Sequence, residues 1–369
     1  MIFRFSRFWL VLLAPLSALL TFLSHKYPAV TERLFSRGLY RIVANGYGRI
    51  FGFLPFSIAQ FLVFLLPVAI VSYLFYVIHR LIKNRMVRKR IVVRLFANIS
   101  CALGIAWFLF AMLCGLNYAR EDFASAIGLE TRHSTAADLA ALCEELALRL
   151  NEGSSYVTRD AQGLMVLSAG TVYALANQAR EALDAAAADY QVLAGFCPLP
   201  KPVLYSRLMS RVNISGIYIP FTMEANVNVD ICDYAIPSIM AHELAHFKGY
   251  MREDEANFIA YLACIASGSP DFIYSGEMLA FAHAANQLRT VSVPDYQRIM
   301  DGLADGVILD MRANSAYWKQ FEGPVADFSR SVNDSYLKSN RQVDGVKSYG
   351  RMVDLLLADY HKRHDKNGK

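Results

Sequence analysis

The residues best suited to chemistry in this chain are His242, Glu243 and His246, which form an HExxH motif. Residues 235–246 have the small and apolar side chains of a buried helix, and a helix places both histidines on one face, one turn apart. Two imidazoles at this spacing can hold one Zn²⁺ ion, and the glutamate between them can take a proton from a metal-bound water. The motif therefore predicts a zinc site that carries out hydrolysis.

A zinc site of this kind needs a third protein ligand, and the residues after the motif offer two carboxylates. Gly249 is typical of a helix end, and residues 250–264 predict a second helix whose acidic first turn suits the helix dipole. Glu253 is the first candidate for the ligand and Glu255 is the alternative, while Asn257 could hydrogen-bond one of the ligand histidines. The competing interpretation is that these acids only cap the helix.

A predicted strand precedes the motif. Residues 212–221 alternate in character and are rich in β-branched and aromatic side chains, which is typical of a strand. Pro220 stands near its end, where an edge strand tolerates proline. An extended peptide substrate could pair with such an edge beside the HExxH helix. An ordinary hairpin strand explains the same pattern without a substrate.

The amino-terminal third of the chain predicts a membrane anchor. The 369 residues are 55% hydrophobic, with a mean hydropathy of +0.27, which is too apolar for an ordinary soluble protein. Residues 8–24, 58–78 and 95–116 are free of charge, and each stretch is near the length that a helix needs to cross a bilayer. We therefore expect three transmembrane helices in a multi-pass protein of the cell membrane, with the lipid bilayer as a partner.

The positive charges predict the orientation of these helices. The loop between the second and third spans is basic and has no acid; it contains Arg80, Lys83, Arg85, Arg88, Lys89, Arg90 and Arg94. Such loops stay in the cytoplasm, so the amino terminus is expected inside and the chain after Leu116 outside. The first loop argues mildly against this orientation, because it carries Lys26, Arg33, Arg37, Arg41 and Arg49. Residues 31–50 are amphipathic, and we expect them to lie along the membrane surface.

Charge and cysteines narrow the function classes further. The net charge of +5 comes from basic residues beside the spans and indicates contact with anionic lipid. No nucleic-acid-binding motif accompanies them, so we expect no nucleic acid partner. The six cysteines are widely and irregularly spaced, and the sequence predicts no disulfide connectivity. Cys264 is expected to be a buried apolar residue.

The chain is expected to divide into a membrane domain, residues 1–118, and an extracytoplasmic domain, residues 119–369. About 250 residues can bury one core. The predicted domain is α+β and mostly helical, with a small sheet edge beside the metal helix. Helices are expected at 134–150, 171–194, 275–288, 293–314, 332–338 and 348–362, and strands at 203–206 and 215–221.

Two side chains are candidates for stabilising an oxyanion during hydrolysis. Tyr349 lies in the polar segment 333–350, and His283 lies in a predicted helix. Tyrosine and histidine often have this role in zinc peptidases. The competing interpretation for each is a solvated loop or a helix cap.

Several motifs resemble a bacterial family known as domain of unknown function 3810. The similar residues are 219–222, 224–228, the HExxH helix, 253–258, 336–338 and 344–349, and the three spans also match. The family is grouped with HExxH zinc peptidases, and Glu253-x-x-Ala256-Asn257 resembles the glutamate motif of glutamate-zincins. That resemblance implies that Glu253 binds zinc. Met223 stands where the resemblance leads us to expect a glycine.

The sequence therefore predicts a membrane-anchored zinc metallopeptidase with a zincin-like domain. Zn²⁺ is the expected cofactor, with His242, His246 and Glu253 as its ligands and Glu243 as the general base. The expected partner is a peptide or protein substrate of the cell envelope. The alternative function is a non-catalytic binding or scaffold protein of the envelope that keeps zinc for stability.

Overall fold

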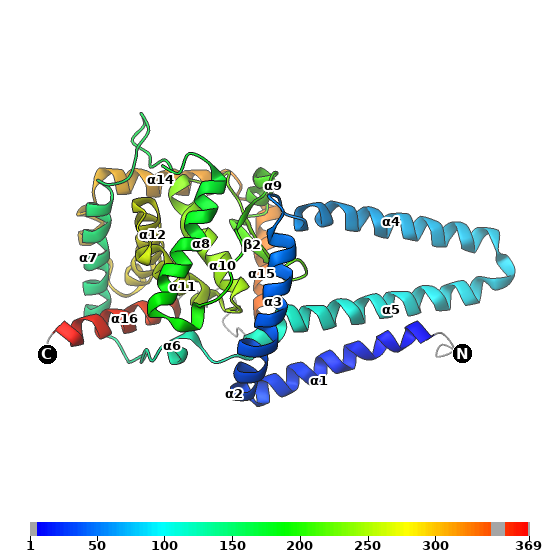
Figure 1. The fold of residues 1–369 in the computed structure, drawn as a ribbon. Coiled ribbons are helices and arrows are strands. Elements are labelled where there is room, and N and C mark those ends of the chain that lie inside the picture. Colours follow the sequence, from blue (N-terminus) through cyan, green and yellow to red (C-terminus); the bar gives the residue numbers. More distant parts are fainter. Residues whose placement is uncertain (1–5, 341–350, 368–369) are drawn as a thin grey trace.

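The computed structural model describes residues 6–340 and 351–367. Most of them are helical, and Figure 1 shows long helices that extend from one side of a compact body. The body is mostly helical and contains a three-stranded sheet. The expectation of a mostly helical chain with a small sheet is confirmed.

Three helices are long and apolar enough to cross a membrane, as predicted. They are Phe8–Lys26, which includes α1 (Leu13–Lys26), then α4 (Ala59–Lys83), and Arg85–Leu113, which includes α5 (Arg88–Leu113). The third begins earlier than predicted, because the basic residues of the loop form its first turns. Gly104 lets α5 approach the first span closely, since an added Cβ would lie 3.1 Å from the Leu10 carbonyl oxygen.

The segment between the first two spans folds onto the carboxy-terminal domain. It contains α2 (Pro28–Val30), the π-helix η3 (Thr31–Leu39) and α3 (Tyr40–Gly52). In Figure 1 this segment lies at the domain end of the spans, while the α4–α5 connection lies at the opposite end. The first loop and the domain thus lie at the same end of the membrane helices.

Protein contacts account for three of the basic residues in the first loop. Arg37 Nη2 lies 3.3 Å from Glu121 Oε2, Arg41 Nη2 donates to the Val192 carbonyl at 2.7 Å, and the Arg49 guanidinium lies 4.7 Å from the centre of the Phe196 ring. These charges therefore have a structural role in holding the loop on the domain, which weakens them as an argument for a cytoplasmic loop.

The helices of the domain are α6 (Phe123–Ala126), α7 (Ala136–Gly153), α8 (Val172–Asp189), α9 (Ser206–Arg211), α10 (Ile236–Phe247), α11 (Glu253–Ala266), α12 (Pro270–Val291), α13 (Val293–Asp301), α14 (Asp305–Lys319), α15 (Pro324–Ser339) and α16 (Arg351–Asn367). Most of them overlap a predicted helix, whereas α6 and α9 were not predicted and α15 begins before the predicted segment 332–338. Thr135 caps α7 with a capping box, and Thr171 caps α8. The predicted helix 293–314 is wrong as a single element, because the chain breaks around Gly302 into α13 and α14.

The sheet has three short strands: β1 (Lys201–Pro202), β2 (Gly216–Ile219) and β3 (Glu224–Val227). Its order is β1-β3-β2, with β3 parallel to β1 and antiparallel to β2. The strand predicted at 203–206 is wrong, since β1 ends at Pro202 and Ser206 begins α9. The sequence analysis missed β3, whose buried Glu224 and Asn226 do not give the apolar pattern of a central strand.

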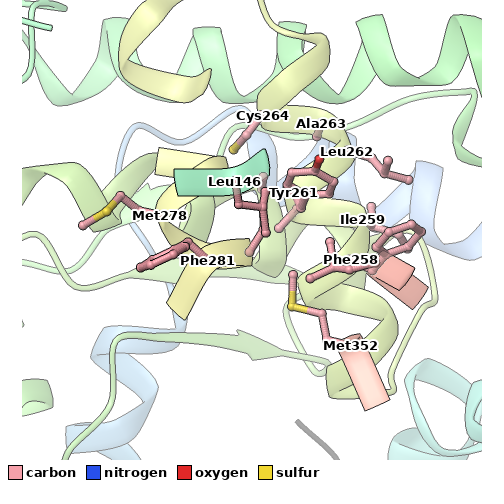
Figure 2. Packing of buried hydrophobic residues seen from close by; sticks show 14 of the residues in the cluster. Leu146, Phe258, Ile259, Tyr261, Leu262, Ala263, Cys264, Met278, Phe281 and Met352 are labelled. Atoms are coloured by element: carbon pink, nitrogen blue, oxygen red, sulfur yellow. The ribbon is translucent and has the colours of Figure 1, made fainter. Parts of the chain in front are cut away.

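The core lies between α7, α8, α10, α11, α12 and α16. Figure 2 shows Leu146 of α7, Phe258 of α11, Phe281 of α12 and Met352 of α16 in one apolar cluster. Cys264 is fully buried there, as predicted, and Gly276 allows the approach of α12, since an added Cβ would lie 2.5 Å from Cys264 Cβ. All six cysteines are free thiols. This packing fixes α11 against α10, and these two helices carry the candidate site.

Candidate metal centre

The HExxH motif lies on α10, which runs through the centre of the domain. Its apolar side chains Met240, Ala241, Leu244 and Ala245 are completely buried. Pro237 occupies the first turn of the helix, where a main-chain N–H has no acceptor within the helix, so the lack of an N–H in proline costs no hydrogen bond. The packing of one helix face leaves His242, Glu243 and His246 on the other faces, as the spacing of the motif predicts.

Gly249 reverses the chain between the two helices of the site. Its φ is +90°, a left-handed conformation that favours glycine. The N–H of Gly249 donates to the His246 carbonyl at 2.9 Å and that of Tyr250 to the Ala245 carbonyl at 3.1 Å, which is the hydrogen-bond pattern of a Schellman motif. The turn leads directly to α11, whose first residue is Glu253.

His242, His246 and Glu253 converge on one point. Glu253 Oε2 lies 3.3 Å from His242 Nε2, and Glu253 Oε1 lies 3.8 Å from His246 Nε2. One ligand atom from each residue lies within 4.8 Å of the other two. The imidazole rings are nearly perpendicular, with an interplanar angle of 89° and centres 4.7 Å apart. Zinc binds nitrogen and oxygen at about 2.0–2.2 Å, so the three ligand atoms are close enough to share one ion after small adjustments.

Each histidine is oriented through its second ring nitrogen. His242 Nδ1 lies 2.7 Å from Asn257 Oδ1, and His246 Nδ1 lies 2.8 Å from the Tyr250 carbonyl oxygen. Both partners are acceptors, so each Nδ1 carries a proton, and in the neutral form of each ring Nε2 holds the lone pair that a metal needs. The sequence analysis predicted the Asn257 contact. It missed the Tyr250 carbonyl, because a main-chain acceptor leaves no trace in the sequence.

The electrostatics of the three groups favour positive charge at this point. Burial lowers the pKa of His242, but the hydrogen bond and negative charge of Glu253 outweigh it and raise that pKa to about 9. Burial lowers the pKa of His246 to about 4, and the neighbouring His242 adds to this decrease. Glu253 thus stabilises a proton on His242 while His246 stays neutral, and a zinc ion bound here would take the place of that proton.

Glu243 is held between α10 and β2. Its side chain is 5% exposed, and its Oε2 atom has no hydrogen-bond partner among the described residues. Burial raises its pKa to about 8, although His242 and a main-chain hydrogen bond from Tyr218 act in the opposite direction. Gly216 of β2 makes this arrangement possible, because a Cβ there would collide with Glu243 and approach Ile239 Cγ2 to 2.8 Å.

The structure places Glu253, and not Glu255, beside the histidines. Glu255 Oε1 accepts from the Phe123 main-chain N–H at 2.8 Å and lies 3.2 Å from Arg252 Nη1. Burial raises the pKa of Glu255 to about 7. This side chain therefore ties α11 to the start of α6, which is a structural role.

The two candidates for oxyanion stabilisation have different outcomes. Tyr349 lies outside the described residues. His283 is half-exposed on α12 and does not belong to the group of side chains that could hold a metal. The sequence analysis missed Tyr218, whose ring centre lies 6.3 Å from that of His246. Its hydroxyl is 3.3 Å from that of Tyr40, which donates to the Phe247 carbonyl at 3.1 Å. In the sequence, the only indication for Tyr218 was the strand-like alternation of side-chain character in residues 212–221.

A buried ion pair supports the turn behind His246. Arg120 Nη2 lies 2.8 Å from Glu32 Oε1, and Arg120 Nη1 donates to the Lys248 carbonyl at 3.2 Å. The guanidinium also lies over the Tyr250 ring, 3.8 Å from its centre. Because the Tyr250 carbonyl holds His246, this contact connects the first loop to a candidate zinc ligand.

One side of the site is bounded by the exposed edge of the sheet. The strand order makes β2 an edge strand, as predicted, although it is shorter than residues 212–221. Ile217 and Phe221 are 39% and 43% exposed beside it. Met223 has a φ of +50°, so the turn from β2 to β3 keeps the conformation of the expected glycine, with the methionine side chain buried.

A comparison with models of protein families identifies the family of this chain. The model of the family described as "Protein of unknown function (DUF3810)" matches residues 35–357. No curated protein and no solved structure matches the chain. The matched region begins in η3 and contains the HExxH helix, the glycine turn and α11. The chain belongs to the DUF3810 family.

Proposed function

We propose that the protein is a membrane-anchored zinc metallopeptidase whose catalytic domain lies outside the cytoplasm. The observation that carries the proposal is the convergence of His242, His246 and Glu253, whose ligand atoms lie within 4.8 Å of one another. The basic loop between the second and third spans supports the orientation, because such loops stay in the cytoplasm.

The residues of the site fit a zinc ion. Two neutral imidazoles and one carboxylate form a ligand set of catalytic zinc sites, which leave the fourth position for water or substrate. The hydrogen bonds to Asn257 and to the Tyr250 carbonyl direct both Nε2 atoms to the same point. When bound, zinc supplies a Lewis acid and lowers the pKa of a coordinated water.

Glu243 is the proton carrier in this proposal. Its buried Oε2 atom is free of competing hydrogen bonds among the described residues, and in its ionised form the carboxylate can accept a proton from the attacking water. The same atom then gives the proton to the nitrogen of the departing amine. The exposed edge of β2 lies beside Glu243 and can align an extended peptide by main-chain hydrogen bonds.

The alternative, a zinc-stabilised scaffold of the envelope, has less support. A structural zinc site has four protein ligands and needs no proton acceptor. Here the group has three ligand residues among the described ones, and a buried carboxylate with an unpaired oxygen adjoins it.

The Glu243→Gln variant tests the proposal. The full chain in nanodiscs is loaded with zinc, and cleavage of labelled, denatured casein is followed. Loss of the proton acceptor should lower the rate by about 10²–10⁴-fold while zinc content stays the same. Glu277→Gln is the matched control, because Glu277 is a buried glutamate of α12 outside the ligand group. Cleavage by Glu243→Gln at the wild-type rate contradicts the mechanism and favours the scaffold.

A further inference from the structure

The helix α3 exposes apolar side chains along one side. The exposed fractions of four such residues, in and beside α3, are 45% for Leu39, 71% for Ile42, 68% for Ile50 and 87% for Phe53. At about 3.6 residues per turn, these positions lie within one narrow arc of the helix. Tyr40, Ala44 and Gly48 lie on the opposite side, buried against the domain. One side of α3 is therefore covered by protein and the other is open and apolar.

The helix α15 has the same pattern. Its exposed apolar residues are spaced three or four apart, and their exposed fractions are 60% for Val325, 71% for Phe328, 52% for Val332 and 38% for Tyr336. The buried residues Ala326 and Leu337 lie on another side of the helix. We call the eight exposed residues of the two helices the basal surface.

Both helices adjoin the ends of membrane spans. Only residues 53–58 separate α3 from α4, and the ring of Tyr336 on α15 lies 6.2 Å from that of Phe110 in the last turn of α5. Figure 1 shows α3 in blue and α15 in orange, running across the direction of α1, α4 and α5. A helix that runs across a set of membrane spans at their ends lies along the plane of the bilayer.

We propose that the basal surface is seated in the bilayer, at the boundary between the headgroups and the acyl chains. Amphipathic helices bury their apolar side by about 5–10 Å at this boundary. The surface is continuous with α4 and α5, two of the helices that can cross a membrane, and this continuity identifies lipid as its partner. Large exposed apolar patches are rare on domains that face only water.

The seating places the candidate metal centre close to the membrane. Tyr40 extends from the buried side of α3. Its hydroxyl donates to the Phe247 carbonyl at 3.1 Å and lies 3.5 Å from the carbonyl oxygen of His246. About one helix diameter, roughly 10 Å, therefore separates the basal surface from the HExxH helix.

This distance defines a substrate class, and that step rests on the proposed peptidase function. An extended chain rises by about 3.3 Å per residue, so about three to five residues connect the bilayer to the site. The substrate is a segment of a membrane-anchored protein that lies immediately next to its anchor.

Fluorescent labels test the seating without any need for activity. Phe328→Cys and Ile42→Cys are labelled in nanodiscs that contain nitroxide lipids, with the unsubstituted chain as the blank for native thiols. Leu148→Cys is the matched control, because Leu148 is an apolar residue, 70% exposed, on α7 at the far side of the domain. We expect several-fold stronger quenching at both basal positions than at Leu148. Equal quenching at all three overturns the seating, as does shielding of the basal labels from both lipid and aqueous quenchers, which indicates a protein partner.

A tethered reporter tests the substrate class. Two reporters carry the same casein-derived sequence after a transmembrane helix, and they differ only in the spacer between the two, which has about 4 or about 30 residues. Because both are anchored in the same membrane, both reach the enzyme at the same concentration. We expect the casein-derived sequence to be cleaved at least several-fold faster in the reporter with the short spacer than in the reporter with the long one. Equal rates overturn the substrate class. If neither reporter is cleaved while the basal labels are quenched, the peptidase function fails and the seating stands.

Discussion

Two sides of the candidate metal centre, the side that carries the candidate ligands and the side that faces the sheet edge, are built differently. On the ligand side, α10 and α11 are packed in the core, and each histidine has a second hydrogen-bond partner. On the other side, β2 is an edge strand of the sheet, and Ile217 and Phe221 are partly exposed. The difference indicates that the geometry of the ligands is fixed in advance, while the edge remains open to a binding partner. Substitutions on the two sides should therefore have different effects.

The largest effect is expected from the ion pair behind the ligand side. Arg120→Ala leaves the buried Glu32 carboxylate without its main partner, and we expect a loss of about 3–5 kcal/mol in the free energy of unfolding. Denaturant unfolding in detergent micelles measures this loss. The control is Arg298→Ala, which breaks an exposed pair with Glu144 and should cost less than about 1 kcal/mol. Equal losses in both variants would show that the pair does not support the site.

A smaller effect is expected where the two sides meet. In Gly216→Ala, the new Cβ collides with Glu243 and displaces either the carboxylate or β2. We expect peptide hydrolysis to fall by about 10²-fold, because small misplacements of a reacting group have effects of this size. Gly268→Ala is the control, since no atom lies within 4 Å of a Cβ at that position. Unchanged hydrolysis in Gly216→Ala would mean that the position of Glu243 is not critical.

The hydrogen bond to His242 should contribute less. Asn257→Ala removes the acceptor that orients the imidazole, and we expect zinc affinity to fall by about 10–100-fold. Competition with a chromogenic chelator measures the affinity. Asn257→Asp keeps an acceptor oxygen and should retain most of it. An Asn257→Ala protein that binds zinc like the wild type would show that packing alone orients the ring.

The smallest effect on stability is expected at the open edge. Ile217→Ser replaces a partly exposed side chain, so the free energy of unfolding should change by less than about 0.5 kcal/mol. If a peptide lies along β2, KM should rise while kcat changes little. The same substitution at Leu148, on α7, should change neither constant. A fall in stability at Ile217, without a change in KM, would contradict the difference between the two sides.

Residues with local sequence signals were predicted well. The histidine spacing, the glycine after the helix, the acidic first turn and the apolar spans all follow from short-range rules, and the structure has each of these elements. The choice between Glu253 and Glu255 depended on a family resemblance, because two acids in one helical turn have the same local pattern. Only the fold shows that Glu255 holds the Phe123 main chain.

Long-range features could not be predicted. The strand β3 is hidden in the sequence, because its Glu224 accepts hydrogen bonds from the main-chain N–H groups of Ile58 and Ala59 at the start of α4. Lys201 Nζ lies 2.7 Å from the same carboxylate. In the sequence alone a buried acid is typical of a loop, and the main-chain partners that explain it here are more than a hundred residues away. The role of Arg120 behind Tyr250 also depends on contacts between distant segments.

The zinc content of the purified full chain tests the central claim most directly. Mass spectrometry should find one zinc ion per wild-type chain and a large loss of zinc in His242→Ala, His246→Ala and Glu253→Ala. Glu255→Gln and His283→Ala, which change residues outside the ligand group, should retain the ion. A wild-type chain that binds no zinc, or a Glu253→Ala chain that holds it as firmly as the wild type, would contradict the account.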